Sequence, residues 1–196
     1  MLYMIDGAQA EDDGSAWEYR RSGTGLSRVQ VRPLSLTVLQ DGLRALSVGT
    51  DIVVDAAVAR ELEQIVPGLD GVERPVTVRG PQPSLLPQPD MVQLGSLATV
   101  RLAPPSIERG EDGQVVALKA PFVLSTDGRV PDPTIYKIEE NQLTLVSQQV
   151  KDLLVAREPR LSFRAVRFED EAAPEEPPRE PFWMPSAEEL KKIKGR

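Results

Sequence analysis

The sequence has 196 residues and contains no cysteine and no histidine. Without cysteine the chain has no disulfide framework, no thiolate nucleophile, no iron–sulfur cluster and no thiolate zinc site. Without histidine it lacks catalytic triads that need a histidine base and metal sites of the H-E-x-x-H type. These absences exclude much of enzyme chemistry, so we expect a protein that binds rather than catalyses, with no metal and no cofactor.

Positive charge is outnumbered by negative charge. Lys and Arg total 23 against 30 Asp and Glu residues, which gives a formal net charge of −7. Nucleic acids and anionic membranes require a basic face, so neither is expected as a partner. No apolar run approaches the roughly 20 residues of a membrane span, and residues 1–14 lack the basic and apolar regions of a signal peptide. A cytoplasmic location is the resulting expectation.

Carboxylates are the remaining candidates for catalysis. Acidic clusters occupy residues 11–13, 108–112, 139–140 and 169–171. All of them fall in predicted turns or tails, without the apolar neighbours that raise the pKa of a carboxyl group. A solvated surface is therefore the favoured interpretation. A carboxylate-dependent enzyme remains the third hypothesis for function, and no catalytic residue is predicted.

Two strand–helix–strand units stand out along the chain. In the first, residues 52–54 end a buried strand, Asp55 is a good N-cap and a Pro-Gly pair stops the helix. In the second, residues 143–146 form the strand and Ser147 is the N-cap. Apolar residues at helical spacing mark the buried face of each helix: Val58, Leu62 and Ile65, then Val150, Leu153 and Leu154.

The two units resemble each other in sequence. Residues 52–63 align without a gap with residues 144–155, and the two caps coincide. One interpretation is that any strand–helix–strand unit shares this pattern; the other is a pseudo-repeat within one domain. Both interpretations predict an α+β fold with a mixed or antiparallel sheet and two N-capped helices in similar units.

Shorter patterns predict the remaining elements. Strands are expected at residues 2–5, 29–38, 72–79, 91–102, 114–119, 121–124, 135–138 and 161–168. The first of these is expected at a sheet edge, and Pro33 places the second at an edge or marks a bulge. Residues 41–48 are expected as a short helix, and the proline-rich residues 80–90 as a loop.

The composition changes after Phe168. Residues 169–181 contain six acids and four prolines, which is typical of a solvated, extended linker. We therefore predict a single α+β domain over residues 1–168, with its core at residues 29–168. This linker and a short amphipathic segment at residues 182–196 follow the domain.

The C-terminal segment is the best candidate for a binding element. Ser186 and Glu189 form a capping box, which favours a helix after the linker. Large apolar side chains in such a segment are typical anchors for a groove. The partner-binding candidates are Phe182, Trp183, Met184, Leu190 and Ile193. Docking in trans, onto a partner or a second copy of the chain, and docking back onto its own domain remain open alternatives.

Over about residues 30–169 the chain resembles a bacterial family. The residues that carry the resemblance are Ile135, Tyr136, Lys137, Leu145, Val146, Ser147, Val150, Lys151, Leu154, Phe163 and Val166, and Trp17 fits an early tryptophan of the pattern. The family is the myxobacterial-type immunity proteins, number eleven in the polymorphic-toxin immunity series and formerly a domain of unknown function. The chain departs from the pattern around Arg160, where a glycine is expected, and residues 91–102 lack the expected aromatics.

The resemblance implies a non-catalytic immunity protein that binds and neutralises a cognate toxin by stoichiometric protein–protein interaction. A net charge of −7 suits attraction to a basic toxin such as a nuclease. The alternative, from another class, is a secretion adaptor or chaperone that holds an effector protein for export.

The substitution Trp183→Ala tests the C-terminal segment. If this segment anchors in a groove of the partner, the substitution weakens the complex by about ten-fold or more, because a desolvated aromatic anchor contributes on the order of 2 kcal/mol. The melting temperature of the isolated protein stays unchanged. Titration calorimetry and thermal unfolding measure the two quantities. A lower melting temperature with unchanged affinity would show that the segment docks onto its own domain.

Overall fold

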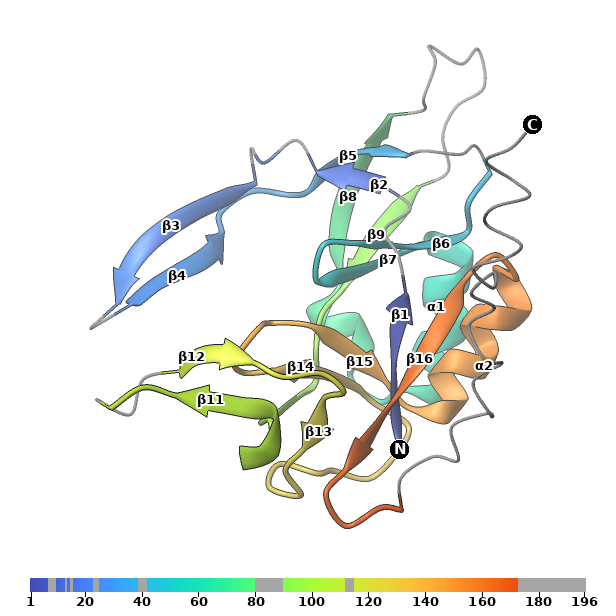
Figure 1. Cartoon of the computed structure of the whole chain (residues 1–196). Helices are drawn as coiled ribbons and strands as arrows, with labels where there is room; N and C mark the ends of the chain where they lie inside the picture. Colours follow the sequence, from blue (N-terminus) through green and yellow to red (C-terminus); the bar gives the residue numbers. More distant parts are fainter. Residues whose placement is uncertain are drawn as a thin grey trace, which may run out of the picture.

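The computed structural model of the chain describes residues 1–6, 10–12, 14, 16–22, 25–38, 42–79, 90–111 and 115–172. Within these residues lie two six-stranded sheets, two α-helices and two projecting hairpins (Figure 1). The predicted C-terminal segment and most of its linker, residues 173–196, lie outside the described residues.

The first sheet contains, in spatial order, β2 (Ala10–Asp12), β5 (Ser35–Val38), β8 (Arg74–Arg79), β9 (Met91–Leu94), β7 (Asp51–Asp55) and β6 (Ala45–Val48). The second contains β10 (Ala98–Val100), β14 (Ile135–Ile138), β15 (Thr144–Val146), β1 (Leu2–Asp6), β16 (Ser162–Phe168) and β13 (Val123–Leu124). The helices are α1 (Ala56–Ile65) and α2 (Gln148–Arg157), with short 3-10 turns η1 (Leu69–Val72) and η2 (Pro104–Ser106). The hairpins are β3 (Trp17–Ser22) with β4 (Gly25–Gln30), and β11 (Ile107–Arg109) with β12 (Val115–Leu118).

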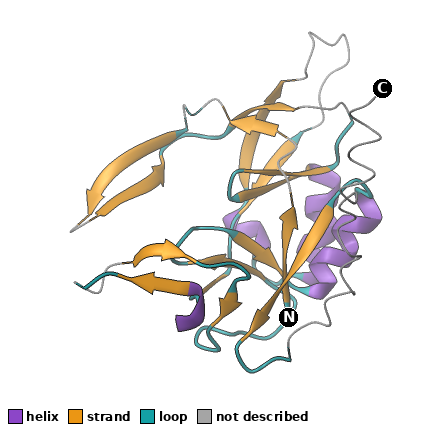
Figure 2. Ribbon diagram, viewed as in Figure 1, coloured by secondary structure: helices purple, strands orange, loops and turns teal. Residues whose placement is uncertain are grey.

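Both large sheets are mixed. β5 runs parallel to β8, β10 to β14 and β13 to β16, whereas the other strand pairs are antiparallel. Figure 2 shows α1 and α2 together on one side of the molecule, where they contact each other. The predicted α+β class, with a mixed sheet system and two helices, is confirmed.

Each helix begins at the residue expected from the sequence. The Asp55 carboxylate accepts a hydrogen bond from the Val58 N–H at 2.7 Å, which caps α1. Ser147 occupies the same position before α2, but its hydroxyl accepts a bond from the Thr134 N–H at 3.2 Å instead. Asp55 therefore acts as a side-chain cap, whereas Ser147 joins the start of α2 to the segment that precedes β14.

The two units share one strand order. The series β6-β7-β9-β8-β5 corresponds to β14-β15-β1-β16-β13, and each helix connects two parallel strands that flank one antiparallel strand. Equivalent strand pairs also share their register. The pair Ala45–Val54 of β6 and β7 corresponds to Ile135–Val146 of β14 and β15. The pair Leu36–Val78 of β5 and β8 corresponds to Leu124–Phe168 of β13 and β16. These features favour the pseudo-repeat interpretation. One difference remains: β9 follows β8 along the chain, whereas its counterpart β1 precedes both units.

One apolar core is shared by the two units. Val58 and Leu62 of α1, with Val150 and Leu154 of α2, are fully buried in it. Strand residues from both sheets complete this core, namely Ala45, Ile52, Val54, Leu94, Ile135 and Val146. Each sheet also encloses a separate core, which includes Leu36, Leu46 and Met91 in the first sheet and Leu2, Tyr136 and Phe168 in the second. Neither helix can therefore leave without exposing apolar residues of the other unit.

A buried carboxylate also links the units. Glu158, just after α2, is 1 % exposed and accepts hydrogen bonds from the Arg44 backbone N–H at 2.9 Å and from the Arg160 guanidinium at 2.8 Å. Burial raises the pKa of Glu158, but the hydrogen bonds from Arg160 and from the Arg44 N–H outweigh this effect, so the pKa lies below its ordinary value. Glu158 therefore stays charged. Its carboxylate joins the end of α2 to Arg44, the residue before β6 of the first unit.

Several predicted elements are wrong or divided. The segment expected as a helix at 41–48 contains β6, in which all four residues are buried because neighbouring groups cover both faces. β1 lies between β15 and β16 rather than at an edge. Residues 29–38 form parts of two strands, β4 and β5, separated at Pro33, which has no N–H to donate. Residues 91–102 contain β9 and β10, which belong to different sheets.

The substitution Glu158→Gln tests the buried link. It preserves side-chain volume but removes the charge that Arg160 binds, so we expect the free energy of unfolding to fall by about 1–3 kcal/mol at neutral pH. The pKa of Glu158 is lower in the folded protein than in the unfolded chain. Its contribution is therefore present above the unfolded pKa, about 4.3, and is lost as the pH falls through the folded pKa.

Urea unfolding near pH 7 and in acid measures both effects, and the difference between wild type and variant should shrink in acid. Asp6→Asn is the control, because the exposed pair of Asp6 with Arg164 contributes less than about 1 kcal/mol. If both variants lose the same free energy of unfolding, the buried Glu158 contributes no more to stability than the exposed Asp6.

Candidate functional site

Two hairpins project from the same side of the molecule (Figure 1). As far as the chain is described, β3 pairs only with β4 and β11 only with β12, so each hairpin carries unpaired strand edges. Val116 on β12 is 62 % exposed. Unpaired edges and exposed apolar side chains are features through which proteins bind other proteins. We call this surface, formed by β3, β4, β11 and β12, the hairpin face.

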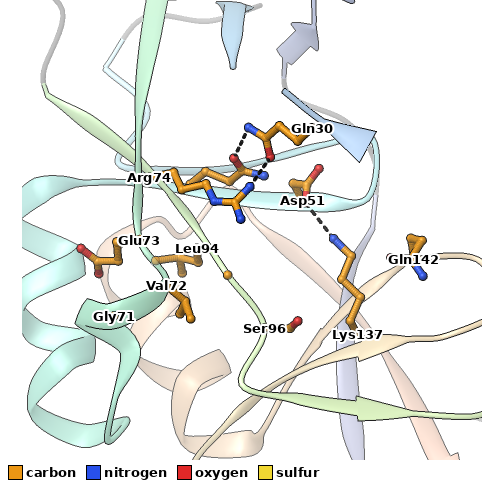
Figure 3. A pocket seen from close by; sticks show the side chains of 12 residues that line it. Gln30, Asp51, Gly71, Val72, Glu73, Arg74, Leu94, Ser96, Lys137 and Gln142 are labelled. Carbon is orange, nitrogen blue, oxygen red and sulfur yellow. Dashed lines mark hydrogen bonds and ion pairs between the residues drawn. The ribbon is translucent and has the colours of Figure 1, made fainter. Parts of the chain in front are cut away.

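A polar pocket of about 330 Å³ lies between the two units (Figure 3). Gln30, at the end of β4, connects it to the hairpin face, and Lys137 on β14 forms part of its other wall. Eight of its twelve lining residues carry polar or charged side chains. Pockets for small apolar ligands have mainly apolar walls, so this one is suited to a charged or hydrogen-bonding group.

Gln30 organises one wall of the pocket. Its amide nitrogen donates to the Gln93 side-chain oxygen at 2.9 Å and to the Arg32 backbone oxygen at 3.1 Å. Its oxygen accepts a bond from Arg74 at 3.1 Å, as Figure 3 shows. Arg74 and Gln93 lie directly opposite each other on β8 and β9. A neutral amide, rather than a carboxylate, thus orients the Arg74 guanidinium.

An ion pair joins the units across the other wall. Lys137 donates to the Asp51 carboxylate at 2.9 Å, and the two side chains are only 21 % and 5 % exposed. Next to Asp51, the Thr50 backbone oxygen accepts a bond from the Thr144 hydroxyl at 2.6 Å. These contacts connect the β6–β7 turn of the first unit with β14 and β15 of the second, so both units shape the pocket.

Glu73 does not neutralise its neighbour Arg74. Figure 3 shows the Glu73 carboxyl group and the Arg74 guanidinium on opposite sides of β8. Burial raises the pKa of Glu73, and the Glu63 carboxylate on α1 raises it further. The Glu73 Oε1 atom is buried and makes no hydrogen bond to any described residue. The positive charge of Arg74 therefore remains available to the pocket.

Two backbone features shape the remaining surface. A Cβ atom at Gly95 would lie 2.6 Å from the Cβ of Val72, so only glycine lets the chain pass this close. Gln142 has a φ of 63°, in the left-handed region that favours glycine. Its side chain lines the pocket and donates to the Glu139 backbone oxygen at 2.9 Å. The chain therefore places a glutamine where glycine would be less strained.

The chemistry of the pocket is that of recognition. It offers a guanidinium, an ammonium paired with a carboxylate, and amide groups, which together bind anions and hydrogen-bonding groups. In the part of the chain that the structure describes, no group of three or more acidic side chains is arranged to hold a metal ion. The same residues include no helix that is long and apolar enough to cross a membrane.

The predicted anchors lie outside the described residues, so their role stays a prediction: Phe182, Trp183, Met184, Leu190 and Ile193. The pocket was not expected from the sequence, because its residues are scattered from Gln30 to Gln142 and form no motif. The one available signal was Lys137, which carries part of the family resemblance and lines the pocket.

Comparison of the chain with protein-family models, with curated proteins and with solved structures finds no match. The family resemblance therefore depends on the motif residues alone. Most of these are apolar residues of the buried cores, including Ile135, Val146, Val150 and Leu154 of the shared core. Membership of the immunity family is accordingly a proposal.

The substitution Lys137→Met tests the ion pair. It leaves the Asp51 carboxylate buried without its cation, so we expect the free energy of unfolding to fall by about 2–4 kcal/mol. Adding Asp51→Asn should recover much of this loss, because no unpaired charge then remains. Lys119→Met is the control, since Lys119 pairs with Glu108 at an exposed site. Chemical denaturation measures all four proteins, and equal effects of the two lysine substitutions would contradict the expectation.

Proposed function

We propose that the protein is a bacterial immunity protein that binds a cognate toxin one to one and neutralises it by covering its active surface. The observation that carries the proposal is the hairpin face, on which unpaired strand edges lead through Gln30 to a polar pocket. A strand of the toxin pairs with a hairpin edge through main-chain hydrogen bonds, and side chains next to that strand provide specificity.

The rigidity of the pocket supports this proposal. An inhibitor that is ordered before it binds loses less conformational entropy on association, which leaves more of the contact energy as affinity. The Lys137–Asp51 pair and the Gln30 hydrogen bonds fix two walls of the pocket in the free protein. The net charge of −7 attracts a basic toxin before contact is made.

The family resemblance adds the biological role. It implies neutralisation of a toxin made by the same cell, in the cytoplasm, without catalysis by the immunity protein itself. A secretion adaptor or chaperone would also bind an effector through exposed edges, but it would leave the activity of that effector intact. Neutralisation therefore distinguishes the two functions.

Co-expression with a toxin-domain protein from the adjacent gene tests the proposal. We expect growth to be restored and a one-to-one complex in size-exclusion chromatography with light scattering. Val116→Lys on the hairpin face should weaken the complex by about ten-fold or more, because it places a charge at a buried contact. The matched control is Val155→Lys: this valine is 37 % exposed on α2, away from the hairpin face, and its substitution should leave affinity unchanged.

Two other outcomes would contradict the proposal. A stable complex in which the effector stays fully active, together with a secretion component in the same gene cluster, would identify an adaptor. Turnover by the purified protein that is abolished by a single Asp or Glu substitution would identify an enzyme.

A further inference from the structure

Two arginines beside the pocket have no carboxylate partner among the residues that the structure describes. Six other arginines pair with Asp or Glu side chains: Arg44, Arg101, Arg129, Arg157, Arg160 and Arg164. Arg32 and Arg74 form no ion pair with any described residue, although acids outnumber bases in the chain. Arg60 on α1 likewise forms no ion pair with a described residue, but Arg32 and Arg74 differ from it because both line one hollow, which points to a ligand that supplies the acid.

Both arginines line a second hollow. It has a volume of about 250 Å³, adjoins the first pocket and shares Gln30 and Arg74 with it. The other described residues that line it are Val31, Arg32, Pro33 and Pro75, so the described lining contains two positive charges and no carboxylate. The prolines have a fixed φ, which makes this part of the wall rigid.

Gln30 connects the backbone of Arg32 with the side chain of Arg74. Its amide group binds the backbone of Arg32 and the guanidinium of Arg74 at the same time. Arg74 uses one N–H on this bond, and its remaining N–H groups have no acceptor among the residues that are described. A guanidinium in this state presents parallel donors that match the two oxygens of a carboxylate.

We infer that Arg32 and Arg74 bind a carboxylate, an aspartate or glutamate side chain of the toxin that inserts into the hollow beside the pocket. The source of this carboxylate rests on the proposed function. The site itself depends only on the two arginines, Gln30 and the absence of an acid among the described residues that line the second hollow.

Two features favour a carboxylate over a phosphate group. Asp51 lines the adjoining pocket, and its carboxylate, although paired with Lys137, repels a phosphate dianion more strongly than a singly charged carboxylate. Phosphate groups commonly bind at the N-terminus of a helix, whereas η1 presents its last residues, Gly71 and Val72, to the pocket.

The arginines and the net charge act at different distances. The charge of −7 attracts a basic toxin from beyond contact, and salt screens this attraction over about 8 Å. Arg32 and Arg74 act only on contact. A single acidic side chain on an otherwise basic toxin surface then distinguishes the cognate toxin from other basic proteins.

Titration of the full-length, ¹⁵N-labelled protein with propionate tests the site without a toxin. We expect saturable shifts in the Nε–Hε signals of Arg32 and Arg74, and binding of the neutral analogue propionamide that is weaker by about ten-fold or more. Arg74→Gln and Arg32→Gln should each weaken propionate binding by about ten-fold. Arg60→Gln is the control, because it removes an arginine of α1 that lines neither pocket.

Three results of this titration would overturn the inference. They are an absence of saturation, equal binding of propionamide, and tighter binding of inorganic phosphate, which would assign the site to a phosphate ligand. Unchanged propionate binding by Arg74→Gln would place the carboxylate elsewhere and would also overturn it.

The toxin complex provides the second test. Arg74→Gln should weaken it by about ten-fold or more, and Arg60→Gln should not. If the toxin binds wild type and Arg74→Gln equally, the inference is wrong and the proposed function stands. If wild type binds no toxin, the proposed function is wrong, and the propionate titration alone decides whether the carboxylate site exists.

Discussion

Burial of both helices in one apolar core is the constraint on which the rest of the structure depends. α1 and α2 each turn an apolar face toward the same core, to which both sheets contribute residues. This packing holds the β6–β7 turn beside β14, so that Asp51 meets Lys137. The pocket has a defined shape because the two sheets that form its walls cannot move apart without opening the shared core.

The two helices and the Asp55 cap could be predicted because their signals are local, whereas the Ser147 hydroxyl, expected to cap α2, binds the Thr134 N–H instead. Apolar residues at i, i+4 and i+7 after a residue such as Asp55 specify a capped helix within a dozen positions. The strand β6 could not be recognised, since its four buried residues show no alternation and its partners lie in other elements. The central place of β1 was hidden for a similar reason: Tyr3 pairs with Val146 and Ala165, at the far end of the described chain.

The candidate site was less predictable than the fold. Its polar residues come from five strands and several turns, and each has an ordinary surface interpretation when viewed alone. Arg74 is informative only because its partner is Gln30 rather than an acid, and a pairing of this kind depends on tertiary structure. The sequence directed attention to the C-terminal aromatic segment instead. The hairpin face is a second candidate for binding, and Trp17 is its one residue that belongs to the family pattern.

The displaced position of β1 has a consequence for synthesis. All strands of the first sheet lie before residue 95 in the chain, so this sheet can assemble while translation continues. The second sheet cannot close until β16 has left the ribosome, because β1 lies between β15 and β16. Until then β1 can pair only with β15, and its other edge has no strand to pair with. The nascent chain therefore carries an unpaired strand edge, which is prone to aggregation, until β16 has been made.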